Sequence, residues 1–311
     1  MTTSTAAHPR PAGPAGETRA RLRRATALIS RSPSGTVGCV VLLVFVAVAV
    51  AGPWIAPENT NASSSYSTDL LAAPSWRHWL GTDDNGRDVL SRLILGARSS
   101  ITVGFAAALV SVVIGAAVGI TSGLAGGWVD RLLSAVDDFF LVLPFLPLAV
   151  VLTSLLSERA DDVPGGRLGI LVGVIGLTLW AGTSRIIRSQ VISVKERQFV
   201  ERARALGASQ WWIARKHVLP HVLPLVLANT ALVVSAAILT ESALAFLGLG
   251  DPLNPSWGSM LDGANESGAL TQGAWWYFLP PGVCIVLAVL SFNLVGHAVE
   301  EIVNPRLRER R

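Results

Sequence analysis

The sequence is poor in charged residues and in the motifs that carry most enzyme chemistry. Only 15% of its 311 residues are Asp, Glu, Lys or Arg, against about 25% in a typical soluble domain. It has two lysines, Lys195 and Lys216, and neither follows a glycine, which excludes a P-loop of the Gly-Lys-Ser/Thr type. It also lacks a His-Glu-x-x-His zinc motif and a Gly-x-Ser-x-Gly nucleophile motif. We therefore expect no catalytic residue, metal site or bound cofactor in this chain.

Cysteine is equally scarce. The two cysteines, Cys39 and Cys284, fall inside long apolar runs, near opposite ends of the segments that we expect to span a membrane. A disulfide requires Cα atoms within about 7 Å of each other, and two thiols do not make a metal-binding set. We expect both side chains to be small apolar packing residues.

Long apolar runs are what the sequence has in abundance. A helix that crosses about 30 Å of hydrocarbon needs roughly 20 residues. The runs without Asp, Glu, Lys or Arg that approach or exceed this length are 35–52, 99–129, 139–157, 168–184, 222–240 and 267–299. The fourth run is short, and we expect its helix to continue to about Arg188. The pattern predicts an all-α polytopic membrane protein with six transmembrane helices.

Basic residues are distributed unevenly between the loops that connect these runs. With the N-terminus inside the cell, 19 of the 25 Lys and Arg residues fall on the inner side and six on the outer side. Because cytoplasmic loops are enriched in Lys and Arg, this distribution predicts that both termini are cytoplasmic. It also accounts for the net charge of +4 without a nucleic-acid partner.

Ionisable residues inside the predicted spans are few. Asp137 and Asp138 fall near the inner end of the third span, Glu241 toward the outer end of the fifth and His297 near the inner end of the sixth. Buried charges in a membrane mark ion or proton pathways, but these residues form no evident relay. For Glu241 a partly hydrated or capped interfacial carboxylate is at least as good an interpretation as a substrate contact.

The segment between the first two spans has its own local pattern. Its acidic residues at 83–88 do not have the alternating oxygen spacing of an EF-hand calcium loop. Asn85-Gly86 predicts a turn, followed by a helix from about Arg87 that could lie on the outer surface. That helix would carry its apolar residues on one side, namely Val89, Leu90, Leu93 and Ile94.

Small residues recur every fourth position in the second span. They are Ser111, Gly115, Gly119 and Gly123. Residues four apart lie on one side of a helix, and small ones let a second backbone approach closely. We expect tight helix–helix packing along this side.

One basic segment, ERARALGASQWWIARKHVLP, interrupts the apolar second half of the chain. Good helix formers fill 196–206, and Gly207 then favours a left-handed turn. Ser209 is a suitable N-cap for a second short helix over 210–218, and Pro220 would mark the return to the membrane. By residue chemistry alone, the segment is either an amphipathic interfacial loop or a docking element for a cytoplasmic partner.

The spacing within this segment resembles a known motif. Permease subunits of bacterial ABC importers carry Glu-Ala-Ala-x-x-x-Gly, nine residues, then Ile-x-Leu-Pro in a cytoplasmic loop. Here Glu201, Ala203 and Gly207 match, as do the later Leu and Pro, whereas Arg202 and His217 depart from the motif. The segments LGTDDNGRDVLSRLILGARSS and AFLGLGDPLNPSWGSML also resemble the C-type permeases of dipeptide, oligopeptide and nickel importers.

This resemblance implies a type I importer permease fold and a non-catalytic role in the bacterial inner membrane. It implies a second homologous permease subunit, two cytoplasmic ATPase domains that bind ATP and magnesium, and an extracytoplasmic solute-binding protein as partners. The expected solute is a dipeptide or oligopeptide, with nickel or another small solute as the alternative. The residues implied to couple the permease to an ATPase are Glu201, Arg202, Ala203, Leu206, Gly207, Ala208 and Trp211.

These features divide the chain into four parts. Residues 1–34 form a basic cytoplasmic tail whose composition is typical of disorder. Residues 35–98 hold the first helix and an external loop, 99–300 a five-helix core with coupling helices at about 195–219, and 301–311 a second basic tail. Two other classes, a self-contained ion-coupled carrier and a membrane enzyme, lack the intramembrane charges or the catalytic motifs that they would need.

Overall fold

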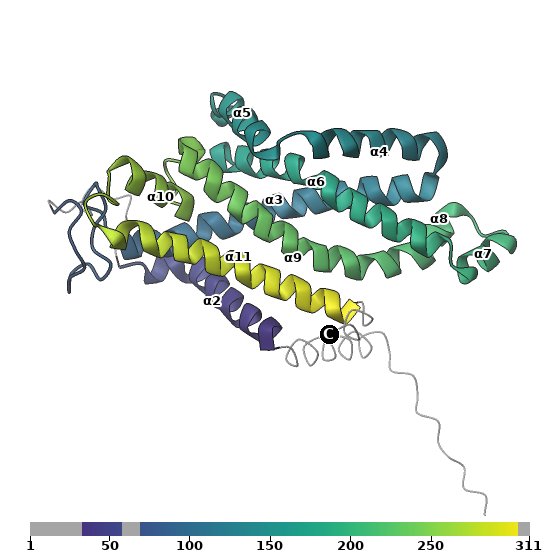
Figure 1. Cartoon of the computed structure of the whole chain (residues 1–311), viewed down its shortest axis with the longest axis horizontal. Helices are drawn as coiled ribbons and strands as arrows, with labels where there is room; N and C mark the ends of the chain where they lie inside the picture. Colours follow the sequence, from purple (N-terminus) through teal and green to yellow (C-terminus); the bar gives the residue numbers. More distant parts are fainter. Residues whose placement is uncertain (1–32, 58–68, 304–311) are drawn as a thin grey trace, which may run out of the picture.

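The computed structural model of the chain describes residues 33–57 and 69–303, and these form a bundle of long helices lying roughly side by side (Figure 1). Within this part of the chain there is no strand, only an isolated bridge between Thr82 and Asp88. The all-α prediction is confirmed. The tails predicted at 1–34 and 301–311 lie largely outside the described residues.

The helices differ widely in length. In chain order they are α2 (Pro33–Ile55), α3 (Val89–Ala125), α4 (Gly127–Val142), α5 (Phe145–Ser157), the 3-10 turn η2 (Ala160–Asp162), α6 (Gly166–Lys195), α7 (Gln198–Ala205), α8 (Gln210–Ile213), the π turn η3 (Ala214–Val218), α9 (Leu219–Leu244), the π turn η4 (Ala245–Leu249), α10 (Trp257–Glu266) and α11 (Trp275–Val303).

Five helical stretches are long and apolar enough to cross a membrane, and α4 with α5 supplies a sixth candidate that is bent by 88°. The prediction of one span at 139–157 therefore needs correction, because the chain turns sharply within it. Leu143 is extended, as expected for a residue that precedes a proline. Pro144 then occupies the N-cap position of α5, so the two helices cannot form one straight rod.

The second span begins earlier than its uncharged run. Gly86 has a φ of 73°, which confirms the predicted turn, but no separate surface helix follows. Instead Asp88 caps α3 by accepting a hydrogen bond of 2.7 Å from the Ser91 amide. The helix then continues unbroken to Ala125. Val89 is fully buried, so these first turns belong to the packed bundle and do not lie on the surface.

Helix α3 packs chiefly against α6, and also against α9 and α2. The predicted stripe of small residues makes the first of these contacts. A Cβ atom at Gly115 would lie 2.7 Å from the Trp180 carbonyl oxygen, and one at Gly123 would lie 2.8 Å from Val191 Cβ. Such distances leave no room for a side chain, so the prediction of close packing is confirmed.

Glu241, the acidic residue toward the outer end of the fifth predicted span, is engaged inside the bundle. Glu241 is 1% exposed and accepts a hydrogen bond of 3.1 Å from the Ser100 hydroxyl. That hydroxyl in turn accepts a bond of 3.2 Å from the Trp257 amide. The expectation that Glu241 is partly hydrated is wrong, because its carboxylate joins α9 to α3 and α10 in a buried network.

The acidic segment at 83–88 is held by ion pairs. The Asp83 carboxylate is completely buried and lies 2.8 Å from Arg87 Nε and 2.5 Å from a terminal nitrogen of Arg92. Tyr277 of α11 donates a hydrogen bond of 2.8 Å to Asp84. These contacts fasten the loop to the ends of α3 and α11.

Candidate functional site

One short element projects from the end of the bundle opposite α10 (Figure 1). It consists of helix α7, a tight turn and helix α8. Helix α7 ends in two hydrogen bonds, from the Ala208 amide to the Ala203 carbonyl and from the Gly207 amide to the Arg204 carbonyl, each of 3.0 Å. This is the Schellman arrangement, which requires a left-handed residue just past the helix end. Gly207 supplies it with a φ of 85°, as predicted.

The second helix begins where the sequence indicates but does not end there. Ser209 caps α8 by accepting a hydrogen bond of 3.2 Å from the Trp212 amide, which confirms its predicted role. The predicted end at Val218 is wrong, since the chain stays helical through η3 into α9, in one stretch of 40 residues, Gln210–Leu249. Pro220 has no amide hydrogen to donate, and the π turn η3 directly before it changes the hydrogen-bond pattern so that the helix can continue. Helix α8 is thus directly continuous with membrane helix α9.

A buried apolar cluster anchors this element to the bundle. Val200 of α7 and Ile213 of α8 are 0% and 1% exposed. They pack into one cluster with α6, η3 and α9, formed by Ile187, Val191, Val194, Val200, Ile213, Val218 and Val222. Burying a side chain of this size contributes roughly 1.5–3 kcal/mol. Helices α7 and α8 are therefore firmly attached to α6 and α9.

Aromatic rings reinforce the attachment. His217 lies between Phe199 of α7 and Trp212 of α8, with ring centroids 5.4 Å and 5.1 Å away. His221, one turn further, stacks on Phe199 at 5.5 Å. This gives the unexpected His217 a structural role, because an aliphatic residue would not make these ring contacts.

Five of the seven predicted coupling residues gather around one groove of about 680 Å³ between α7 and α8. They are Arg202, Ala203, Leu206, Gly207 and Ala208. Leu206 is 89% exposed at the tip of the turn, although an apolar side chain gains by leaving water. Glu201 is exposed on α7 but does not line the groove, and Trp211 lines a different one.

Sequence reasoning misses three residues that line the groove: Phe199, Ser209 and Trp212. Trp211 and Trp212 look alike in the sequence, but adjacent residues of a helix point about 100° apart. Trp212 therefore faces α7, whereas Trp211 faces the end of α3. Helical phase from the Ser209 cap could have distinguished the two.

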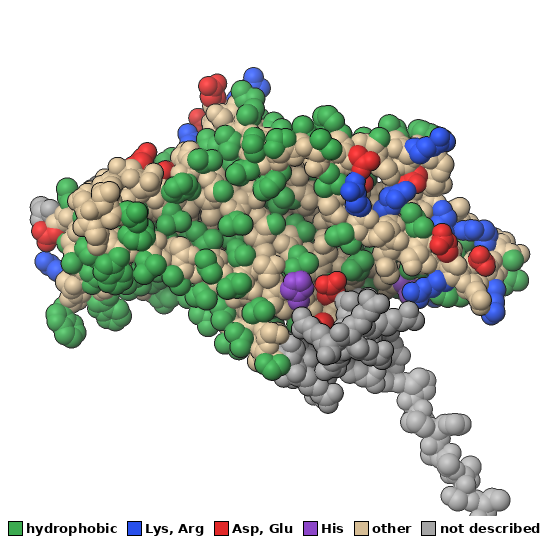
Figure 2. Space-filling model, viewed as in Figure 1, with side chains coloured by type: hydrophobic (Ala, Val, Ile, Leu, Met, Phe, Trp, Pro, Cys, Tyr) green, Lys and Arg blue, Asp and Glu red, His purple; other side chains and the backbone are tan. Residues whose placement is uncertain are grey.

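Charged side chains gather at this end of the molecule (Figure 2). Between the helices they are paired: Arg188 of α6 contacts both carboxylate oxygens of Asp130 in α4, at 2.6 Å and 2.7 Å. Lys195 donates to the Gly123 and Leu124 carbonyls at the end of α3, at 3.2 Å and 2.8 Å. On the projecting element, by contrast, no salt bridge within 33–57 and 69–303 involves Glu201, Arg202 or Arg204.

The projecting element has no evident catalytic chemistry. Within the described ranges, no group of three or more His, Cys, Asp and Glu side chains could hold a metal ion. What the element offers is a rigidly mounted surface with an exposed leucine, a shallow groove and charges outside any salt bridge among the described residues. Fold and site together define a polytopic membrane protein that carries a short helical element outside its bundle.

Comparison with known families identifies this membrane protein further. The family described as the binding-protein-dependent transport system inner membrane component matches residues 111–309. The N-terminal transmembrane domain of oligopeptide transport permease C matches residues 21–74. Together these matches cover most of the chain. The chain belongs to the family of binding-protein-dependent transport system inner membrane components, which are permease subunits of ABC importers.

Curated relatives match over most of their length. The dipeptide transport system permease protein DppC of Alkalihalophilus pseudofirmus is 32% identical over 92% of this chain and 90% of its own. DppC of Bacillus subtilis is 35% identical over 87% of this chain and 81% of its own. A protein named as a putative peptide permease of Brucella suis is 35% identical over 86% of both chains.

A solved structure shares the fold. It is an inward-facing form of the MetNI methionine ABC transporter, with a TM-score of 0.52 and 20% identity over 69% of this chain and 95% of the matched chain. At this identity the likeness bears on the fold alone. It agrees with the predicted importer permease architecture.

Proposed function

We propose that this chain is the permease subunit of an ATP-driven peptide importer and that α7, the Gly207 turn and α8 dock onto an ATPase subunit. The peptide substrate is supported by the relatives named for dipeptide or peptide transport. In this proposal a second permease subunit completes the pathway and an external binding protein delivers the solute. Two ATPase domains bind ATP and magnesium, and this chain binds neither.

The docking proposal rests on one observation: Leu206 is exposed on an element that is firmly attached to the bundle. A leucine that is 89% exposed at the tip of a tight turn is unfavourable unless a partner covers it. The side chains that flank it on the groove, Arg202 and Ala208, leave room for a complementary surface. Arg202, where the family motif has alanine, would meet an acidic residue of the partner.

The contacts of α7 and α8 with the bundle suggest how a movement at the turn would reach the membrane helices. Helix α7 is fixed to α6 through Val200, and α8 continues into α9 without a break. Both α6 and α9 pack on α3. A displacement of the turn by closing ATPase domains would therefore move these spans as packed units, the kind of rigid-body shift that switches transporters between states.

The basic end of the bundle supports placing this site in the cytoplasm. Nine Lys and Arg residues between 131 and 216 belong to this end of the chain's helices, including all of those on α7 and η3. Because basic residues concentrate on the cytoplasmic side, the projecting element would face the ATPases, and both termini would be cytoplasmic.

The docking proposal can be tested with Leu206→Asp, using Leu206→Met as the matched control. In the complete complex, the charged variant should lose ATPase co-purification and dipeptide uptake while its membrane insertion stays normal. The methionine variant should retain both, because it keeps an apolar side chain of similar size. Unchanged ATPase association in Leu206→Asp would refute the docking role.

The substrate proposal needs a separate measurement. Proteoliposomes that contain both permeases, the ATPases and the binding protein should accumulate labelled dipeptide only with ATP supplied on the ATPase side. Uptake of peptide by this chain alone would contradict the ATP-driven mechanism, and uptake of nickel with no peptide competition would contradict the proposed substrate. Neither result would bear on whether Leu206 contacts an ATPase.

A further inference from the structure

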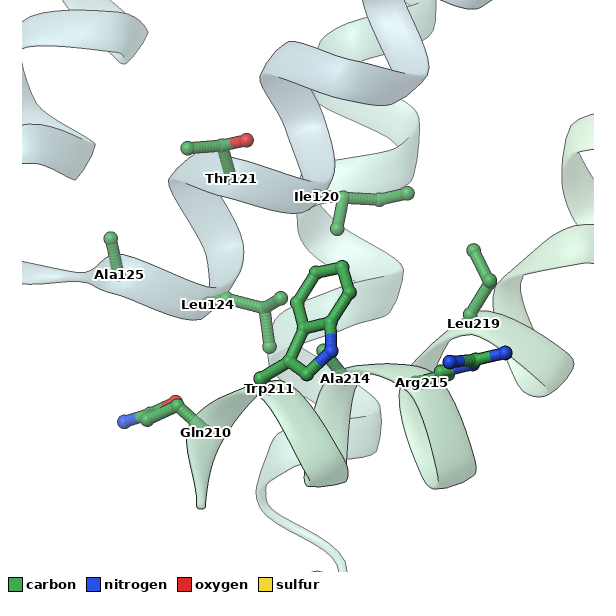
Figure 3. A pocket seen from close by; sticks show the side chains of 9 residues that line it. All are labelled: Ile120, Thr121, Leu124, Ala125, Gln210, Trp211, Ala214, Arg215 and Leu219. Carbon is green, nitrogen blue, oxygen red and sulfur yellow. The ribbon is translucent and has the colours of Figure 1, made fainter.

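A second groove, distinct from the one lined by Leu206, opens between the last turns of α3 and the start of α8 (Figure 3). Its volume is about 690 Å³, which is within the range of small-ligand sites. The residues that line it are Ile120, Thr121, Leu124, Ala125, Gln210, Trp211, Ala214, Arg215 and Leu219. We call it the α3–α8 groove.

The walls of the α3–α8 groove are largely apolar. Ile120 and Leu124 are half-buried and pack behind it on the cluster that anchors α7 and α8. Trp211 and Leu219 are 75% and 45% exposed, and the Trp211 ring stands between the two walls in Figure 3. A long apolar surface of this kind at the end of membrane helices suits a hydrocarbon chain.

The polar groups of the groove are positive or neutral. Arg215 is exposed, and no carboxylate in the described part of the chain forms a salt bridge with it. In Figure 3 the Trp211 indole nitrogen lies on the side of the ring toward Arg215. A guanidinium and an indole N–H that line the same groove supply hydrogen-bond donors, which match the oxygens of a phosphate.

The depth of the groove agrees with this chemistry. It lies where α3 ends and the 40-residue helical stretch begins, near the Asp130–Arg188 ion pair and Lys195, which donates to the last carbonyls of α3. Tryptophan is enriched at the level of lipid headgroups, and basic residues near that level attract anionic lipids. A hydrocarbon wall joined to a phosphate-binding rim at this depth is complementary to one lipid class.

We propose that the α3–α8 groove binds an anionic phospholipid, with an acyl chain against Ile120, Leu124 and Leu219 and the phosphate on Arg215 and the Trp211 indole N–H. The lipid would fill the space between α3 and α8. It would thereby connect the docking element to the bilayer itself. This inference does not depend on which solute is transported.

Native mass spectrometry of the complete complex tests the proposal. The probes are phosphatidylglycerol and phosphatidylcholine with identical acyl chains, and glycerol phosphate as the headgroup without a chain. The wild type should prefer phosphatidylglycerol, and Arg215→Gln should weaken that binding about fivefold, the value of one basic residue near an anionic surface. Lys216→Gln is the matched control, because the adjacent lysine carries the same charge but does not line the groove.

Several outcomes would overturn the lipid assignment. Equal binding of the two lipids by the wild type would contradict recognition of an anionic headgroup. Equal losses in Arg215→Gln and Lys216→Gln would contradict a specific contact at Arg215. Full displacement of lipid by glycerol phosphate would indicate a free-phosphate site. A photoreactive residue in place of Leu219 should label lipid; labelling of an ATPase or permease chain would show that a protein covers the groove.

Discussion

Arg188 of α6 holds Asp130 of α4 through two hydrogen bonds of 2.6 Å and 2.7 Å, one to each carboxylate oxygen. The pair is partly shielded, with side chains 31% and 19% exposed. Asp130 also accepts a hydrogen bond from the Ser122 hydroxyl of α3. One carboxylate thus ties together three helices near the end that carries α7 and α8.

We predict that Arg188→Gln destabilises the chain by about 1–2 kcal/mol, because Asp130 loses a two-point charged partner while staying partly buried. Arg185→Gln is the control. Arg185 pairs with Asp138, but both side chains are more than half exposed, and such surface pairs contribute about 0–1 kcal/mol. Thermal unfolding of the purified protein in one detergent should show a clear loss for Arg188→Gln and a small one for Arg185→Gln. Equal losses would mean that the Arg188–Asp130 pair contributes no more stability than the exposed Arg185–Asp138 pair.

Two glycines predict opposite effects of the same substitution. Gly→Ala in a helix normally stabilises by about 0.5–1 kcal/mol, and at Gly173 of α6 nothing lies within 4 Å of the position that an added methyl would take. At Gly115 the added methyl would lie 2.7 Å from the Trp180 carbonyl oxygen and 2.8 Å from Thr183 Cβ. Gly173→Ala should therefore raise the thermal midpoint, whereas Gly115→Ala should lower it by forcing α3 and α6 apart. A rise in both would contradict the close contact of α3 with α6.

The buried carboxylate of Glu241 supports a third prediction. It accepts hydrogen bonds from Ser100 and, at 3.4 Å, from Ser242. Glu241→Gln keeps an acceptor oxygen and should leave stability nearly unchanged. Glu241→Leu leaves buried hydroxyls without an acceptor and should cost about 1–3 kcal/mol. If Glu241→Leu were as stable as Glu241→Gln while peptide uptake was lost in both, Glu241 would act on the solute and not in the buried network.

Local chemistry explains why much of the local structure of α7, the Gly207 turn and α8 could be predicted. Gly207 and Ser209 determine their turn and cap through interactions within a few residues, and the every-fourth-residue pattern from Ser111 to Gly123 encodes one helix face. The resemblance of the motif around Glu201 supplied the family. Each of these features depends on residues that are close in sequence or on one helix.

The features that could not be predicted depend on contacts between distant segments. The burial of Glu241 requires Ser100 and Trp257, which come from other helices. The different surroundings of Trp211 and Trp212 depend on where α3 ends. The chain breaks its helix before Pro144 but continues it through Pro220. A proline alone therefore does not determine whether a helix ends. A preceding extended residue decides the first case and a π turn the second.

Gly207 provides the sharpest test of the proposed docking role, because its surroundings separate backbone strain from steric clash. Its φ of 85° is left-handed, yet nothing lies within 4 Å of the position a Cβ would take. Gly207→Val therefore destabilises the turn through backbone conformation alone, by about 1–3 kcal/mol. Gly207→Asn introduces a side chain of similar size, but asparagine tolerates this conformation. We expect Gly207→Val to abolish substrate-stimulated ATP hydrolysis and uptake in the reconstituted complex while inserting normally into the membrane. Gly207→Asn should retain most of both. If the asparagine variant were as inactive as the valine variant, side-chain bulk at the partner surface, and not the angle of the turn, would be the cause; full activity in both would exclude the turn from coupling.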